Sequence, residues 1–286
     1  MRGTLAGRVF RGRADFPAPY GDRMPGSSPS RSRHQPSASH EPPDRQTDTE
    51  DRPATTTAAA GPEPAWPTVT LAARTARAAV LLVAGALVIT VAWLLRSPSH
   101  DLVQTTVPTT VDLPGVTAVS EVAVVLLGLA CTVAGWQALR RGGASLALAV
   151  AAGAGVVAAY AASEGLKALV QADRVCRDIG VVDCPGEGSW GFPSNHTTIA
   201  VAGATAVVLL VRSRWPRWAQ AAVVVLAVLG GVGRVLQGVH APHEVVAGAV
   251  LGSVVVLVVV LLVAPVLASP AAAGRLDALS SPLRAR

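Results

Sequence analysis

The chain has 286 residues and a formal net charge of +6; 51% of its residues are hydrophobic and only 4% are aromatic. Long runs of Ala, Val, Leu and Gly alternate with short clusters of charged residues. This pattern indicates a membrane protein and argues against a soluble domain with a single core.

The N-terminal part, residues 1–76, is rich in Arg, Pro, Ser, Thr and Gly and includes the acidic patch EPPDRQTDTED. It has too little apolar surface to form a core, so we expect a disordered cytoplasmic tail. The tail lacks the apolar run of a cleavable signal peptide, so the first span is expected to act as an uncleaved anchor. We expect its arginines to be solvated, with no nucleic acid as partner.

Apolar stretches of 17 or more residues follow the tail, and each is long enough to cross ~30 Å of hydrocarbon as a helix. There are six, at 78–95, 119–138, 144–162, 195–211, 218–236 and 244–266. We therefore predict an all-α fold, a polytopic membrane bundle of six transmembrane helices. The bundle would occupy residues 77–268, with 269–286 as a short cytoplasmic tail.

The distribution of Lys and Arg indicates the orientation of the bundle. If both termini are inside, the inner flanks hold ten positive residues and the outer connections hold five. Positive residues near span ends favour the cytoplasmic side. We therefore place the termini in the cytoplasm, in a multi-pass protein of the plasma membrane.

Two cysteines, Cys176 and Cys184, share the predicted outer loop between the third and fourth spans. An oxidising outer compartment permits a disulfide between them. Two free thiols remain the alternative, because the sequence does not fix the geometry of the pair.

Polar residues gather at span ends on this same outer side, where they would form one pocket. They are Lys167, Arg174, Ser194, His196, Arg234, His240 and Glu244. Lys167 and Arg174 are seven residues apart, so a continuing helix would place both on one face. Three fixed cations suit a phosphate dianion, whose oxygens match the fork of a guanidinium.

The other polar residues suggest a chemistry for the pocket. Pro193 and Ser194 mark a helix N-terminus, where free N–H groups favour an anion. His240 and Glu244 are four residues apart, so the carboxylate would fix the tautomer of the imidazole and leave its second nitrogen free to attack phosphorus. His196 would then donate a proton to the leaving oxygen.

Three motifs carry a resemblance to a known family. They read K-x6-R from Lys167 to Arg174, P-S-N-H from Pro193 to His196, and R-x5-H-x3-E from Arg234 to Glu244. In this order they resemble the signature of type 2 phosphatidic acid phosphatases, lipid phosphate phosphatases related to the vanadium haloperoxidases. The resemblance covers residues 78–266.

The resemblance implies roles for these residues. His240 would be the nucleophile that becomes phosphorylated, Glu244 would orient it, and His196 would protonate the departing alcohol and later activate water. The phosphate oxygens would be held by Lys167, Arg174, Ser194, Asn195 and Arg234. Neither a metal nor another cofactor is implied. The spacing of His240, His243 and Glu244 also differs from the H-E-x-x-H pattern of zinc sites, and His243 has no assigned role.

Four positions depart from the family pattern: Val175 replaces Pro, Asn195 replaces Gly, Gly233 replaces Ser and Glu244 replaces Asp. They bear on substrate and rate more than on the type of reaction. Asn tolerates unusual backbone angles better than most residues, and its N–H stays available to phosphate.

The sequence thus predicts an integral membrane phosphatase that hydrolyses a lipid phosphate monoester or a prenyl diphosphate at the outer leaflet through a phosphohistidine. Its partners would be the membrane lipid substrate and the bilayer. One alternative is a lipid-binding or scaffold protein that has lost turnover. Another is a phosphoryl or head-group transferase that uses the same phosphohistidine with an acceptor other than water.

Overall fold

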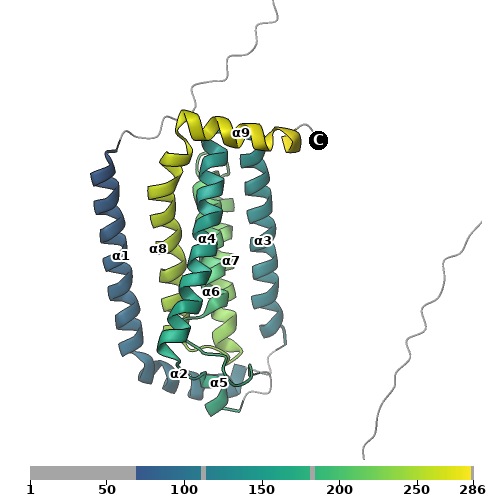
Figure 1. Ribbon diagram of the computed structural model, residues 1–286. Helices are drawn as coiled ribbons and strands as arrows, with labels where there is room; N and C mark the ends of the chain where they lie inside the picture. The colour runs from purple at the N-terminus through teal and green to yellow at the C-terminus, as the bar shows by residue number, and fades with distance from the viewer. Residues whose placement is uncertain (1–68, 111–113, 181–183, 285–286) are drawn as a thin grey trace, which may run out of the picture. The chain divides into compact units, whose positions relative to one another are not determined.

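The structure is a computed structural model that describes residues 69–110, 114–180 and 184–284. Within these ranges the regular secondary structure is entirely α-helical (Figure 1). The predicted N-terminal tail lies outside the described residues, apart from residues 69–76. The first helix already begins within those residues, at Leu71.

The long helices of the bundle coincide with the six predicted apolar stretches. They are α1 (Leu71–Leu94), α3 (Val116–Arg141), α4 (Gly143–Val170), α6 (Asn195–Val211), α7 (Arg217–Leu236) and α8 (Pro242–Leu267). Five of them are long and apolar enough to cross a membrane. The other, α6, is apolar but has only 17 residues. The all-helical fold is confirmed, and the structure supports five spans by length and composition.

Three shorter helices lie where the sequence predicted only connections or a tail. They are α2 (Arg96–Thr110), α5 (Val175–Asp178) and α9 (Pro270–Arg284). The sequence of α2 is rich in Thr and contains Pro108, so its intrinsic helix propensity is low. Its buried Val103 and Val107 pack against Val175, and this tertiary contact stabilises the helix.

Helix α9 lies across the end of the bundle opposite to α2 and α5 (Figure 1). Asp277 attaches it to the turn between α3 and α4, because its Oδ1 accepts a hydrogen bond from the N–H of Gly143 at 3.1 Å. The same carboxylate pairs with Arg284 at 3.1 Å. The predicted C-terminal tail therefore contains a helix that is docked through polar contacts.

Close packing between α6 and α8 depends on two glycines. A Cβ at Gly248 would lie 2.6 Å from the carbonyl oxygen of Ser194, and a Cβ at Gly252 would clash with the carbonyl of Thr198. Small residues let helix backbones approach closely in membrane bundles. Here they bring the first turn of α6 against the first three turns of α8, which places the polar starts of both helices side by side.

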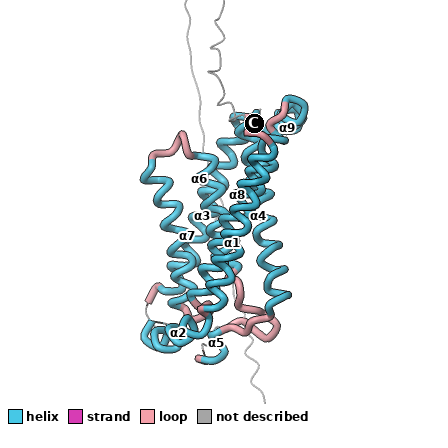
Figure 2. The backbone as a smooth tube through the Cα atoms, turned by 90° about the vertical axis from the view of Figure 1, so that its left-hand side faces the viewer, coloured by secondary structure: helices cyan, strands magenta, loops and turns pink. Residues whose placement is uncertain are grey.

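Figure 2 shows the bundle from the side, with the connection that carries α5 and the turn between α7 and α8 at the same end as α2. The predicted site residues belong to these connections and to the adjoining helix ends. The fold thus collects the predicted site residues at one end of the bundle.

Candidate active site

The centre of the site is a buried pair formed by His240 and Glu244. The imidazole Nδ1 lies 2.7 Å from Glu244 Oε2, and the two residues are 1% and 0% exposed. On the other side of the ring, Nε2 lies 3.1 Å from an NH1 of Arg174. The imidazole is therefore held between a carboxylate and a guanidinium.

These two neighbours assign the tautomer of His240. A guanidinium only donates hydrogen bonds and an ionised carboxylate only accepts them. Nδ1 must therefore carry the proton and donate it to Glu244, while the lone pair of Nε2 faces Arg174. This is the form in which Nε2 can act as a nucleophile.

Glu244 is fixed by its main chain as well as by its side chain. Oε2 also accepts a hydrogen bond from the N–H of Ala241 at 3.1 Å. The carbonyl oxygen of Glu244 accepts a hydrogen bond from the N–H of Ser194 at 3.0 Å. The start of α8, which orients His240, is thus bonded directly to the residue that caps α6.

Gly191 forms the wall beside the second carboxylate oxygen of Glu244. Glu244 Oε1 is buried and accepts no hydrogen bond from the described residues. A Cβ at Gly191 would clash with this oxygen and lie 3.3 Å from the carbonyl of Asp173. A residue without a side chain is therefore required there.

We expect Gly191→Ala to displace the carboxylate of Glu244 and to destabilise the protein by about 1–3 kcal/mol, the usual cost of overpacking. Thermal unfolding in detergent and phosphate release would measure the two effects. Gly186→Ala is the matched control, because a Cβ there meets nothing within 4 Å. If both variants were equally stable and active, the proposed clash would be wrong.

Arg174 reaches the site from a loop and not from α4. Helix α4 ends at Val170 because Gln171 adopts a left-handed conformation with φ of 48°. The expectation that a continuing helix would carry both Lys167 and Arg174 is therefore wrong. Arg174 is nevertheless buried, at 6% exposed, and its guanidinium touches His240.

Ser189 positions Arg174, and the sequence analysis missed this residue. Arg174 Nε donates to Ser189 O at 3.0 Å and NH2 donates to Ser189 Oγ at 3.0 Å. A further bond runs from Arg174 NH1 to the carbonyl of Val239 at 3.3 Å. Ser189 lies in a loop of glycine, proline and polar residues with no periodic pattern, so only the folded contact reveals its role.

A disulfide and a second arginine hold the loop that carries Ser189. Cys176 and Cys184 are joined, with their Cα atoms 5.6 Å apart. Arg177 donates to the carbonyls of Gly186 at 2.9 Å and Ser189 at 3.1 Å. The loop that supports Arg174 is therefore closed by a covalent bond and by hydrogen bonds.

Lys167 and Asn195 meet at Glu164, which lies one turn before Lys167 in α4. Lys167 Nζ is 3.9 Å from Glu164 Oε1, and Asn195 Nδ2 donates to the same oxygen. Asn195 Oδ1 accepts from the hydroxyl of Ser163 at 2.5 Å. The side chain of Asn195 is thus bonded to α4. Only its backbone N–H remains for the phosphate contact that the sequence predicted.

Ser194 caps α6 and uses its side chain for that purpose. It is fully buried, and its Oγ accepts from the N–H of Thr197 at 3.5 Å and from the hydroxyl of Thr197 at 3.1 Å. The N-cap stabilises the helix whose first turn carries His196.

His196 occupies the second position of α6 and is exposed. Its imidazole lies close enough to Arg234, His240, Arg174 and Lys167 to feel their charges. The structure therefore places both predicted catalytic imidazoles and the three predicted cations near one another. An exposed imidazole near a buried one is suited to exchange protons with solvent or substrate.

Arg234 enters the site from the last turn of α7 and is anchored by Gln237. Its NH1 donates to Gln237 Oε1 at 2.9 Å, and Gln237 Nε2 donates to the carbonyl of Val116 at 3.3 Å. Arg234 Nε is buried and donates to no acceptor among the described residues. This leaves part of the guanidinium available to an anion.

Two of the departures from the family pattern have packing explanations. A Cβ at Gly233 would lie 2.9 Å from the Cβ of Ser120 in α3, so a serine at this position would push α3 and α7 apart. Val175 is 0% exposed and belongs to the cluster with Val103 and Ala241, so its apolar side chain helps attach α2 to the end of the bundle.

His243, which had no predicted role, anchors α8 to α2. It is 4% exposed; its backbone N–H donates to Ser99 Oγ at 3.0 Å, and its Nδ1 lies 3.0 Å from the same oxygen. Its ring also stacks on Phe192 with centroids 5.8 Å apart. The ligand atoms of His100, His243 and Glu244 lie within 4.8 Å of one another, and His243 and Glu244 already contact Ser99 and His240.

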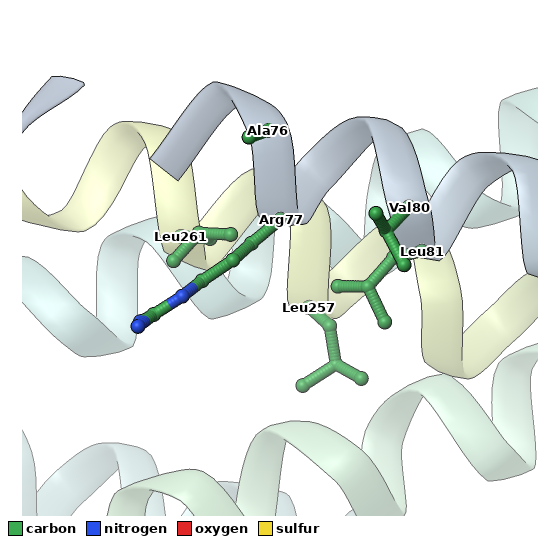
Figure 3. Close-up of a pocket in the computed structure, with 6 residues that line it drawn as sticks. All are labelled: Ala76, Arg77, Val80, Leu81, Leu257 and Leu261. Carbon is green, nitrogen blue, oxygen red and sulfur yellow. The ribbon is translucent and has the colours of Figure 1, made fainter. Parts of the chain in front are cut away.

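Two apolar hollows adjoin α1 and α8. Figure 3 shows the first, which is lined by Ala76, Arg77, Val80, Leu81, Leu257 and Leu261. It lies toward the start of α1 and the end of α8, away from the predicted site residues. The second lies between α1, α2 and α8, where Val91, Leu95 and Val246 line it and His243 borders it. Only the second hollow adjoins the site.

The surroundings of His240 allow a prediction of how kcat/KM depends on pH. Burial lowers the pKa of His240 from its ordinary value of 6.5, and Glu244 opposes this shift. The positive charges of Arg174 and Arg234 act in the same direction as burial. If His240 is the nucleophile, as the sequence predicts, it must be unprotonated, so we expect the acid limb of the kcat/KM profile to lie below pH 6.5.

A set of substrates with different phosphate pKa values controls this measurement, because a phosphate monoester itself titrates near pH ~6. A limb that stays constant across the set belongs to the enzyme, whereas one that shifts belongs to the substrate. A constant limb above pH 6.5 would contradict the lowered pKa of His240.

Helices of membrane length bring a buried imidazole, a carboxylate and several cations together, as in a multi-pass membrane protein with a polar cluster at one end of its bundle. A sequence model of the PAP2 superfamily matches residues 79–266, and the chain belongs to that superfamily. This confirms the family that the three motifs predicted.

The chain is similar to the crystal structure of the first transmembrane PAP2 type phosphatidylglycerolphosphate phosphatase from Bacillus subtilis. The two share 20% sequence identity with a TM-score of 0.48, and the match covers 64% of this chain and 93% of that chain. A search of curated proteins found no match.

Proposed function

We propose that the protein is a lipid phosphate phosphatase that removes phosphate from a monoester or a prenyl diphosphate through a phosphohistidine at His240. The observation that carries the proposal is the position of its ring, with Nδ1 2.7 Å from Glu244 and Nε2 3.1 Å from Arg174. This arrangement orients a nucleophile toward a cation that would hold its target. Membership of the PAP2 superfamily supports the same reaction.

In the first step, Nε2 of His240 attacks phosphorus while the bond to the leaving oxygen breaks. The electron pair of that bond goes to the oxygen, which takes a proton from His196. The proton on Nδ1 stays with the phosphorylated ring, and the charge of Glu244 stabilises the cation that forms. Lys167, Arg174 and Arg234 neutralise the oxygens of the phosphoryl group.

In the second step, water attacks the phosphohistidine and His196 takes a proton from that water. The bond between phosphorus and Nε2 breaks, and the electron pair returns to the nitrogen. For a monoester, one ester and one water are consumed and one alcohol and one phosphate are formed; for a prenyl diphosphate, the leaving group is the prenyl monophosphate, so one diphosphate and one water give one prenyl monophosphate and one phosphate. The reaction needs neither a metal nor another cofactor.

The second apolar hollow supports a lipid as the substrate. Its lining includes Val88, Val91, Leu95, Leu102 and Val246, which suit a hydrocarbon chain. His243, the residue before Glu244, also lines it, so a chain lying there could place its head group near the site.

We propose that α6 is the sixth span and that both termini are cytoplasmic. A helix of 17 residues is about 26 Å long, close to the thickness of the hydrocarbon core. The positive flanks then face the cytoplasm, and the site faces the outer leaflet of the plasma membrane. The disulfide between Cys176 and Cys184 suits an oxidising outer compartment.

The test is phosphate release by the full-length protein in detergent, with phosphatidate, phosphatidylglycerol phosphate and a prenyl diphosphate as substrates and with EDTA present. Release from at least one of them is the expected result. If the lipids bind without release at any pH, the protein is a lipid-binding scaffold. If added alcohols or acceptor lipids capture the phosphoryl or head group in place of water, the protein is a transferase.

A further inference from the structure

A carboxylate lies beside the lysine that is expected to bind phosphate. Glu164 Oε1 is 3.9 Å from Lys167 Nζ, and the side chains are 49% and 11% exposed, respectively. The ammonium is thus nearly covered, whereas the carboxylate is accessible. An anion that approaches Lys167 must therefore come close to a negative charge already paired with it.

Asn195 holds this carboxylate in place. The hydroxyl of Ser163 donates to Asn195 Oδ1 at 2.5 Å, so the Nδ2 end of the amide is left to donate to Glu164 Oε1. Because Asn195 is the first residue of α6 and Glu164 lies in α4, the contact joins two helices. The glycine usual in the family has no side chain for this bond.

We propose that Glu164, held by Asn195, competes with phosphate for Lys167 and so weakens the binding of inorganic phosphate, the product. The proposal rests on the proposed function, because it takes Lys167 as a phosphate ligand. The pairing offsets part of the charge on the lysine, and the remaining negative charge repels a dianion. Glu164 is thus a positioning residue that favours product release.

The test is the affinity of the full-length protein for inorganic phosphate, measured by calorimetry in detergent without turnover. Glu164→Gln removes the charge but keeps an oxygen that can accept from Asn195. We expect phosphate to bind about three- to tenfold more tightly in this variant, the range expected for one partly exposed charge. The constant for inhibition of lipid hydrolysis by phosphate should fall by the same factor.

Asp101→Asn is the matched control, because it removes the same charge from an exposed residue of α2 at the same end of the bundle. Its phosphate affinity should equal that of the wild type. Unchanged or weaker binding in Glu164→Gln, or equal tightening in the control, would overturn the proposal.

The hydrogen bond by which Asn195 holds Glu164, here called the tether, is tested by repeating the measurement with Asn195→Gly. A free carboxylate spends less time near Lys167, so the effect of Glu164→Gln should be smaller in this background. An equal effect in both backgrounds would overturn the tether. These outcomes differ from a failure of the proposed function, which would appear as no phosphate release from any lipid by the wild type.

Discussion

His240→Ala is expected to reduce phosphate release to the uncatalysed background, a loss of at least ~10⁴-fold. Removing a nucleophile leaves only binding and electrostatic stabilisation, which account for the small activity that remains in such variants. The buried carboxylate of Glu244 also loses its partner at 2.7 Å, so it no longer serves catalysis. The measurement is the initial rate of phosphate release from the best lipid substrate.

Loss of folding would give the same loss of activity, so this prediction needs a readout of the intermediate. Rapid quenching of the wild type with labelled substrate should trap an acid-labile phosphoenzyme, and His240→Ala should give none. Thermal unfolding in detergent shows whether the variant is folded. Formation of the same phosphoenzyme by folded His240→Ala would assign the nucleophile to another residue.

His196→Ala is expected to lower kcat/KM for a lipid substrate by ~10²- to 10⁴-fold, the usual contribution of a general acid or base. The imidazole is exposed at the start of α6, so its removal should leave no buried cavity and little loss of stability. The proton for the lipid alcohol would then come from water, which is a weaker acid.

Substrates with different leaving groups distinguish acid catalysis from a structural role for His196. A nitrophenol leaves without much protonation, so the formation of the phosphoenzyme from nitrophenyl phosphate should be nearly as fast in the variant as in the wild type. Hydrolysis of the phosphoenzyme still needs a base, so the phosphoenzyme should accumulate in the variant. An equal loss for both leaving groups, without accumulation, would rule out the acid role.

The long helices and the motif residues could be predicted from the sequence because each is marked by a local pattern. Each apolar stretch overlaps a helix. The predicted stretch at 195–211 has the same first and last residues as α6. The three motifs lie at helix ends, where a charged residue among apolar runs stands out. Their residues meet in the structure because the ends of neighbouring helices meet.

The remaining features depend on contacts that leave no periodic pattern in the sequence. Helix α2 has poor helix formers and exists through packing of Val103 and Val107. Ser189 is one serine in an irregular loop, yet its two oxygen atoms hold Arg174. The bond between Asn195 and Glu164 joins residues 31 positions apart, and no spacing rule relates residues on separate helices.

The bond between Ser194 N–H and the carbonyl of Glu244 has a consequence for substrate range. Together with the close approach of the backbones at Gly248 and Gly252, it holds the starts of α6 and α8 against each other as one unit. This unit has little freedom to adapt to lipids of different shape. If the second apolar hollow holds the lipid chain, we expect differences in chain length or branching to be accommodated by α1 and α2, which line it, and selection for new substrates to change residues on those two helices first.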